Sequence, residues 1–281
     1  MGEWKFAFAS ATGNSHTGES IPCQDHCDVA DHGDFTISVV CDGAGSCVHA
    51  DIGSKQVVQF CLYHFNHTVR ANNWYKGATL PEAEVWQKTA KETLLAVKED
   101  LEKYSINEGL PFKSLGCTVI LVITLPAGLL VTHIGDGRAG YLNNEGEWAA
   151  LITPFHGNEA NETVFITSDI WNDEVADTYV TSKVIAGGIK AICLLTDGCE
   201  KAAFECNLYD AEREVYYDPN KPYPPFFKSN IEIIPRLFKN GLSQEEVNSN
   251  WRTFLEGGND KLRAEPDDKT LVLGVRTTEM N

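Results

Sequence analysis

The chain has 281 residues, 43% of them hydrophobic and 22% charged, which is the composition of an ordinary globular protein and excludes a disordered or fibrous one. Its net charge of -17, from 40 acidic and 23 basic residues, argues against nonspecific nucleic-acid binding, because phosphate backbones require clustered cations. The N-terminus lacks a basic segment followed by an apolar one, and no apolar run approaches membrane-spanning length. We therefore expect a soluble protein without nucleic-acid or membrane partners.

The first half of the chain has two strand-like segments, residues 4–11 and 35–41, and we predict a polar loop between them at 12–34. Apolar residues at helical spacing then predict helices over about 50–65 and 80–104.

The second half is mostly of β character up to Thr196, and turn signals such as Pro126 to Gly128 divide it. Strands are predicted in 116–125, 128–137, 138–148, 163–167, 178–185 and 188–196. Helical patterns return near 200–204, 231–238 and 243–254, and the segment 265–276 ends in a strand.

Strands and helices thus come in blocks rather than in strict alternation, which predicts an α+β fold with mainly antiparallel sheets covered by helices. We expect one domain over residues 1–281. Residues 205–230, rich in proline and aromatic residues, are predicted to be an irregular loop. Its aromatic side chains could cover the site or bind a partner, although long loops more often pack on their own domain.

Nine cysteines are scattered along the chain with no C-x-x-C pair, so neither a zinc site nor a disulfide framework is favoured. Several lie inside apolar runs, as Cys193 does in A-I-C-L-L-T, where a thiol acts as a small buried hydrophobe. Reduced thiols are typical of the cytosol, and we expect a cytoplasmic protein.

Several aspartates share one local pattern, in which an apolar or β-branched run lies beside an Asp-Gly or Asp-Asp step. They are Asp42 in V-V-C-D-G-A-G, Asp136 in T-H-I-G-D-G-R, Asp197 in C-L-L-T-D-G, and Asp267 with Asp268 in E-P-D-D-K-T. Asp25, in P-C-Q-D-H-C, precedes the second predicted strand. Any one of them is most often a turn residue, and Asp136, between two glycines, fits a plain hairpin best.

The set of aspartates weakens the turn interpretation. Strand ends of a sheet layer converge on one rim, where several carboxylates repel one another unless cations lie among them. Oxygen ligands without His or Cys select Mg²⁺ or Mn²⁺ over zinc. Two such ions about 3.5 to 4 Å apart turn a bridging water into a nucleophile and neutralise phosphate oxygens during in-line displacement. A glycine after Asp42 also lets its carbonyl approach an ion closely.

Six short motifs follow one another along nearly the whole chain. They are Q-D at 24–25, D-G-A-G at 42–45, G-C-T at 116–118, G-D-G-R at 135–138, T-D-G at 196–198 and D-D-K-T at 267–270. This series resembles the metal-dependent type-2C serine/threonine protein phosphatases, the PPM family. The opening S-A-T-G-N-S-H together with C-D-G-A-G-S is most similar to a bacterial branch of that family.

The resemblance implies a four-layer α-β-β-α sandwich with two central, mainly antiparallel sheets and a Mg²⁺ or Mn²⁺ centre at one end. It implies that Asp42 bridges two ions, the Gly43 carbonyl binds the second, and Asp197 and Asp267 bind the first. Asp25 would act through metal-bound water, and Asp136 with Asp197 would hold a third, weaker ion. The catalytic residues implied are Asp25, Asp42 and Asp197.

The chain departs from the family pattern at three positions. Gln24 stands where many members carry Glu, and His16 stands where many carry an arginine that grips the substrate phosphate. His16 can bind phosphate or can be a loop histidine with a structural hydrogen bond, and the residues favour neither. Ala44 occupies the place of a proposed general acid in eukaryotic members, so the proton donor is unassigned.

We expect a protein serine/threonine phosphatase that uses direct attack of a water bridging two ions. Its substrate would be a phosphorylated protein, chosen with the help of a flap over residues 153–182, and a partner serine/threonine kinase is a further expectation. We expect a monomer. The alternatives are a catalytically silent phosphoprotein-binding module, favoured by His16, Gln24 and Ala44, and a metal-dependent phosphatase of small phosphate esters.

Overall fold

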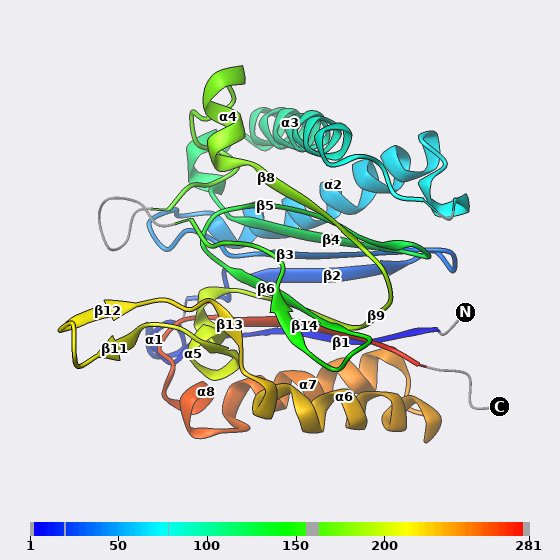
Figure 1. Ribbon diagram of the computed structural model, residues 1–281. Coiled ribbons are helices and arrows are strands. Elements are labelled where there is room, and N and C mark those ends of the chain that lie inside the picture. The colour runs from blue at the N-terminus through cyan, green and yellow to red at the C-terminus, as the bar shows by residue number, and fades with distance from the viewer. Residues whose placement is uncertain (1–2, 20, 78, 156–162, 278–281) are drawn as a thin grey trace.

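The computed structural model describes residues 3–19, 21–77, 79–155 and 163–277. Two five-stranded sheets pack face to face, and long helices cover the outer face of each (Figure 1). Every strand pair in the two sheets is antiparallel. This order of layers confirms the predicted α-β-β-α sandwich.

The first sheet has the strand order β1-β14-β9-β6-β7. Its strands are β1 (Trp4–Ala11), β14 (Lys269–Arg276), β9 (Ile189–Leu195), β6 (Arg138–Asn143) and β7 (Trp148–Ala150). The last strand in sequence therefore lies between β1 and β9. Helices α6 (Pro224–Lys239) and α7 (Gln244–Gly257) cover this sheet (Figure 1).

The second sheet has the strand order β2-β3-β4-β5-β8. Its strands are β2 (His26–Asp31), β3 (Thr36–Cys41), β4 (Val119–Leu125), β5 (Gly128–Ile134) and β8 (Thr181–Ala186). Helices α2 (Ala50–Ala71) and α3 (Ala83–Glu108) cover it (Figure 1).

The shorter elements connect the layers. They are α1 (Asn14–Glu19), α4 (Asp173–Tyr179), α5 (Glu200–Ala203), α8 (Asp260–Ala264), the 3-10 turns η1 (Trp74–Lys76), η2 (Phe112–Leu115) and η3 (Asp197–Cys199), and the short strands β10 (Phe204–Glu205), β11 (Leu208–Asp210), β12 (Val215–Tyr217) and β13 (Lys221–Pro222).

Three buried apolar clusters hold the four layers together, one between the sheets and one under each pair of helices. A buried tryptophan fixes each helical layer to its sheet. The Trp86 indole of α3 donates a 2.8 Å hydrogen bond to the Val131 carbonyl of β5, and the Trp251 indole of α7 donates one of 2.9 Å to the Leu271 carbonyl of β14. Burial of the three apolar clusters supplies the main stabilisation of the fold, and the two hydrogen bonds fix the orientation of the tryptophans.

Most predicted elements are present, but three predictions were wrong in detail. The loop predicted at 12–34 contains α1 and the edge strand β2. The strand predicted at 163–167 is not formed, because the Ser168 amide closes a turn on the Phe165 carbonyl. The segment 205–230, predicted to be irregular, contains the β11–β12 hairpin and the beginning of α6.

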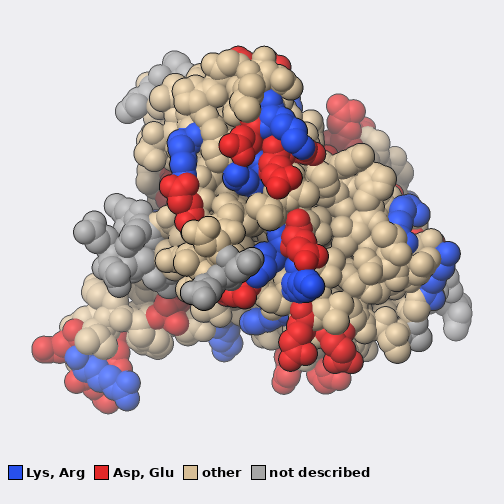
Figure 2. All heavy atoms as spheres, turned by 90° about the horizontal axis from the view of Figure 1, so that it is seen from above, with Lys and Arg blue, Asp and Glu red and all other residues tan. Residues whose placement is uncertain are grey.

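No helix in the described ranges is long and apolar enough to cross a bilayer. Figure 2, which looks down on the α3 side of the molecule, shows acidic and basic side chains interspersed over that face. A mixed distribution of this kind differs from the basic patch that nucleic-acid binding requires.

Candidate metal centre

The aspartates of the sequence motifs lie at one end of the sandwich, where strands of both sheets begin or end. Asp42 follows β3, and the charges of Asp25, Asp197, Asp136 and Asp267 all act on it. Burial is the largest cause that raises the pKa of Asp42 well above its usual range, and these four carboxylates raise it further. The structure therefore brings all five predicted carboxylates into one neighbourhood.

Asp197 belongs to this group as well. It begins η3 one residue after β9, and its carboxyl group interacts with that of Asp42. Burial, followed by the charges of Asp136 and Asp267, raises the pKa of Asp197 to about 7. Two neighbouring carboxylates at such positions share a proton more readily than they ionise together.

Asp25 is buried and is held by threonines of the first sheet. Thr196 Oγ1 donates a 2.8 Å hydrogen bond to Asp25 Oδ2, and the Thr270 hydroxyl also acts on the carboxylate. Burial raises the pKa of Asp25 to about 8, the charges of Asp268 and Asp197 add to the rise, and the two hydroxyls oppose it.

The donor set fits a hard divalent cation, because it consists of carboxylate and carbonyl oxygens whose mutual repulsion a cation would relieve. The side-chain oxygen Oε1 of Gln24 is also buried beside Asp25 without a hydrogen-bond partner in the described chain. The carboxylates do not form a closed cluster: among the described residues, no three His, Cys, Asp or Glu side chains meet closely enough to hold an ion. Repulsion between like charges opposes closer approach.

Glycines allow the loops of this end to touch. A Cβ at Gly43 would collide with the Gln24 carbonyl oxygen, and one at Gly198 would collide with the Asp268 carbonyl oxygen. The glycines after Asp42 and Asp197 are therefore required by contact with a neighbouring loop, a stronger reason than turn formation alone.

The G-C-T motif fixes the backbone of Asp42. Thr118 Oγ1 accepts a 3.0 Å hydrogen bond from the Asp42 amide, and the Thr118 amide donates one of 2.8 Å to the Asp42 carbonyl. Gly43 also forms an isolated antiparallel bridge with Cys117. Ala44 is buried and brings no titratable group to this loop.

Asp268 holds the N-terminal loop against the centre. Its carboxylate accepts hydrogen bonds from the Gly13 amide at 2.8 Å and the Gln24 amide at 2.6 Å. His16 Nδ1 lies 3.0 Å from Asp268 Oδ1, without the alignment of a hydrogen bond. His16 thus has a structural neighbour on its Nδ1 side, and its phosphate-binding role stays a prediction.

A sequence profile described as Protein phosphatase 2C matches residues 12–247. The chain belongs to the protein phosphatase 2C family. This is a family of metal-dependent serine/threonine phosphatases that act on phosphorylated proteins, so the chain is a phosphoprotein phosphatase. The bacterial sequence motifs agree with this membership.

Individual relatives of the phosphatase span its whole length. Serine/threonine-protein phosphatase 3 of Escherichia coli (strain K12) is 28% identical in an alignment that covers 97% of this chain and 98% of that protein. Two solved structures share the fold. Serine/threonine phosphatase Stp1 from Staphylococcus aureus has a TM-score of 0.53 and 14% identity, over 99% of this chain and 96% of that one. The catalytic domain of PstP, in complex with two manganese ions, has a TM-score of 0.54 and 14% identity, over 98% of this chain and 99% of that one.

Arg138, at the end of the G-D-G-R motif, is a residue of the phosphatase to which the motif pattern assigned no role. It is fully buried, its Nε donates a 2.9 Å hydrogen bond to Glu200 Oε2, and its Nη2 lies 2.7 Å from Asp218 Oδ2. Its Nη1 donates a 2.9 Å bond to Asn220 Oδ1. The arginine therefore joins the Asp136 and Asp197 motifs to the segment after the β11–β12 hairpin. The sequence signal for this connecting role is an arginine directly after an Asp-Gly step.

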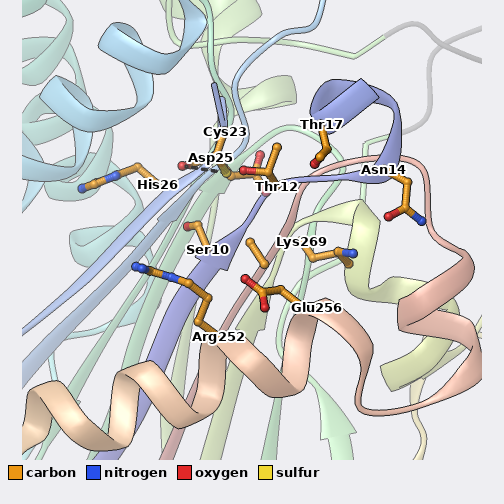
Figure 3. A pocket seen from close by; sticks show the side chains of 11 residues that line it. Ser10, Thr12, Asn14, Thr17, Cys23, Asp25, His26, Arg252, Glu256 and Lys269 are labelled. Carbon is orange, nitrogen blue, oxygen red and sulfur yellow. Dashed lines mark hydrogen bonds between the residues drawn. The ribbon is translucent and has the colours of Figure 1, made fainter. Parts of the chain in front are cut away.

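A polar pocket of about 650 Å³ opens between the edge strands β1 and β2 and reaches Asp25 (Figure 3). Ser10 of β1 and Thr12, directly after β1, line it from one side, and Arg252 and Glu256 project toward it from α7 (Figure 3). Solvent in this pocket would lie beside the candidate centre of the phosphatase.

The predicted flap, 153–182, lies partly outside the described residues, since 156–162 are not among them. His133 of β5 joins its two ends. His133 Nε2 donates a 3.0 Å hydrogen bond to the Thr153 carbonyl, and Nδ1 accepts one of 2.8 Å from Thr181 Oγ1. Burial lowers the pKa of His133 to about 4, which keeps the imidazole neutral for this pair of bonds.

Proposed function

We propose that this phosphatase hydrolyses phosphoserine and phosphothreonine in proteins at a centre of two Mg²⁺ or Mn²⁺ ions. The Asp42 carboxylate would bridge the ions, the Gly43 carbonyl would bind the second, and Asp197 with Asp267 would bind the first. Asp25 would act through water, and Asp136 with Asp197 would hold a third, weaker ion.

The observation that carries this proposal is the gathering of four further carboxylates around Asp42. A protein gains little from gathering five mutually repelling carboxylates at one end of the sandwich unless cations bind there. The two manganese ions in the PstP catalytic domain support the choice of metal. When bound, such ions supply an activated water as nucleophile and neutralise phosphate oxygens.

The residues of the chain orient this chemistry. Thr118 fixes the backbone of Asp42, and Thr196 aims the Asp25 carboxylate. Asp268 holds the loop that carries His16 and faces the imidazole on its Nδ1 side, which leaves Nε2 for a substrate phosphate. Ala44 offers no proton to the leaving alkoxide.

We further propose a single phosphatase domain over residues 1–281 that works as a cytoplasmic monomer and reverses the action of a partner serine/threonine kinase. The central apolar cluster contains side chains of both sheets, as expected for one domain. All nine cysteines are free thiols, which fits a reducing compartment.

The test is hydrolysis of p-nitrophenyl phosphate with Mn²⁺ and with chelator. We expect Mn²⁺-dependent turnover that Asp42→Asn and Asp197→Asn each abolish, while circular dichroism shows an intact fold. Asp260→Asn, at an exposed aspartate of α8, is the matched control and should keep activity. Turnover like that of the wild type in both centre variants would overturn the proposal.

The same assay separates the alternative functions. A phosphopeptide that binds without Mn²⁺-dependent turnover would favour a silent binding module. Faster turnover of small phosphate metabolites than of phosphopeptides would favour a phosphatase of small esters.

A further inference from the structure

The β11–β12 hairpin exposes aromatic side chains on both of its faces. Its register pairs Leu208 with Tyr217 and Tyr209 with Tyr216, so neighbouring pairs point to opposite faces. Tyr216 is 74% exposed and Tyr209 54%. Five of the twelve large apolar or aromatic side chains that are exposed in the described residues lie in this hairpin. Neither face of the hairpin is therefore covered by the rest of the described chain.

The hairpin is held in place although it projects from the body of the molecule (Figure 1). An isolated two-stranded hairpin is only marginally stable in water. Here the Asp210 carboxylate accepts hydrogen bonds from the Glu212 and Arg213 amides and closes the turn. At the base, Arg138 binds the side chains of Asp218 and Asn220. The exposed aromatic residues are thus presented on a fixed element.

The base of the hairpin adjoins the candidate metal centre. Arg138, which binds Asp218 at the base, also binds Glu200, three residues after Asp197. A chain bound along the hairpin would therefore run close to the carboxylates that we propose as metal ligands.

The acidic side chains of the hairpin favour a basic partner. Glu212 and Glu214 have no ion-pair partner among the described residues, whereas Arg213 lies 3.7 Å from Asp210. In Figure 2 the hairpin stays at the left, as in Figure 1, and acidic side chains surround a basic one at its end. A phosphate approaching five carboxylates on a chain of net charge -17 is repelled, and basic residues beside the phosphate would offset this repulsion.

The strands also have open edges, since β11 and β12 pair only with each other in the described chain. Open edges accept an extended peptide through backbone hydrogen bonds, and exposed aromatic rings bind its side chains.

We propose that the hairpin of residues 208–217 is a docking element for phosphoprotein substrates, and that it binds a basic, extended segment flanking the phosphorylated residue. This inference rests on the proposed phosphatase function and adds a substrate preference to it.

The test compares three substrates with the full chain in Mn²⁺: p-nitrophenyl phosphate, a phosphothreonine peptide flanked by Arg and Lys, and the same peptide flanked by Glu. We expect kcat/KM to be about tenfold higher for the basic peptide than for the acidic one. The double variant Glu212→Lys/Glu214→Lys should lower the basic-peptide kcat/KM five- to tenfold, mainly through KM, and leave p-nitrophenyl phosphate turnover unchanged. Glu84→Lys/Glu108→Lys, at exposed positions of α3, makes the same charge change on the opposite side of the sandwich and should have no such effect.

A second variant removes the aromatic contacts without a change of charge. Tyr209→Ser/Tyr216→Ser should weaken binding of both peptides, as measured by fluorescence anisotropy, whereas Tyr63→Ser on α2 should not. Unchanged kcat/KM and unchanged anisotropy in both hairpin variants would overturn the docking role. So would a dimer in sedimentation that the tyrosine variant dissociates, because a second copy would then cover the hairpin.

Failure of the inference is distinguishable from failure of the proposed function. If the wild type does not turn over p-nitrophenyl phosphate with Mn²⁺, the phosphatase proposal fails. Anisotropy of the basic peptide still measures docking in that case, with weaker binding to Glu212→Lys/Glu214→Lys supporting the docking role and equal binding overturning it.

Discussion

Thr196 Oγ1 donates a 2.8 Å hydrogen bond to Asp25 Oδ2, and so joins the end of β9 in the first sheet to the residue before β2 in the second. The same hydroxyl accepts a 3.1 Å bond from the Thr270 amide. The orientation of Asp25 therefore depends on how the two sheets pack at this end.

Thr196→Val removes this hydroxyl and keeps the shape of the side chain. A hydrogen bond to a charged group contributes about 1.5–3 kcal/mol, so we expect Mn²⁺ affinity to fall at least tenfold in isothermal titration calorimetry. Thr36→Val is the control, because it breaks the 2.7 Å hydroxyl pair with Thr124 at the other end of β3. The control should lose stability and keep its Mn²⁺ affinity, and equal Mn²⁺ affinity in both variants would contradict the prediction.

Gly43→Ala and Gly45→Ala place the same methyl group at two positions of one motif. At Gly43 the methyl meets the Gln24 carbonyl oxygen and forces the backbone to move, whereas at Gly45 it meets nothing within 4 Å. We expect Gly43→Ala to lower the free energy of unfolding by about 1–3 kcal/mol and to abolish phosphatase activity. Gly45→Ala should stay within about 0.5 kcal/mol of the wild type in urea unfolding. Two equally stable, equally active variants would show that the loop contact is unimportant.

The raised pKa values of Asp25, about 8, and Asp197, about 7, make stability depend on pH when chelator is present. In the unfolded chain an aspartate ionises near pH 4, so between about pH 4 and 8 the folded state holds protons that the unfolded state has released. This contribution to stability is fully present below pH 4 and is lost as pH rises through the folded pKa values. We expect Asp25→Asn to lose less stability than the wild type between pH 5 and 8 in urea unfolding. Identical losses would refute the raised pKa of Asp25.

Divalent cations should reverse this dependence. Mn²⁺ binds ionised carboxylates, so its stabilising effect should grow from pH 5 to pH 8. The rise of the thermal midpoint on adding Mn²⁺ at the two pH values measures this, and a rise that is larger at pH 5 would contradict it.

Burial shifts the pKa of His133 in the opposite direction, so its contribution to stability changes with pH in the opposite sense. Its folded pKa of about 4 lies below the ordinary value of 6.5, so between pH 6.5 and 4 the unfolded chain binds a proton that the folded chain does not. Stability is therefore lost as pH falls through this window. His133→Gln cannot take up the proton, and its loss of unfolding free energy between pH 7 and 5 should be smaller than that of the wild type by about 2 kcal/mol. A larger loss in the variant would be evidence against a neutral His133 that joins the ends of segment 153–182.

Strand and helix patterns in the sequence predicted an α+β fold with antiparallel sheets, and strand ends with Asp-Gly or Asp-Asp steps predicted a rim of carboxylates. The family resemblance implied the sandwich and the place of Asp25. The sequence patterns missed β2, since this edge strand reads H-C-D-V-A-D and has no clean apolar alternation. Ile166 is fully buried but lies outside any strand, so the apolar run 163–167 reflected burial rather than β structure.

The contacts of Arg138 and Asp268 could not be predicted. Arg138 binds residues 62 to 82 positions later in the chain, and Asp268 binds amides 244 and 255 positions earlier. Such pairings depend on the three-dimensional path of loops and leave no periodic trace in the sequence. The exposed hairpin was missed for a different reason. Aromatic residues are usually buried, whereas the tyrosines of this hairpin are exposed.

The place of β14 between β1 and β9 has a consequence for biosynthesis. During translation the N-terminal strand β1 leaves the ribosome more than 250 residues before the strand that hydrogen-bonds to it, as the pairing of Trp4 with Arg276 shows. The second sheet, by contrast, is complete once residue 186 has been made. A nascent chain would therefore carry Asp25 and Asp42 on a finished sheet, yet lack the strand that brings Asp267 beside them, and would become active only after nearly the whole sequence has emerged.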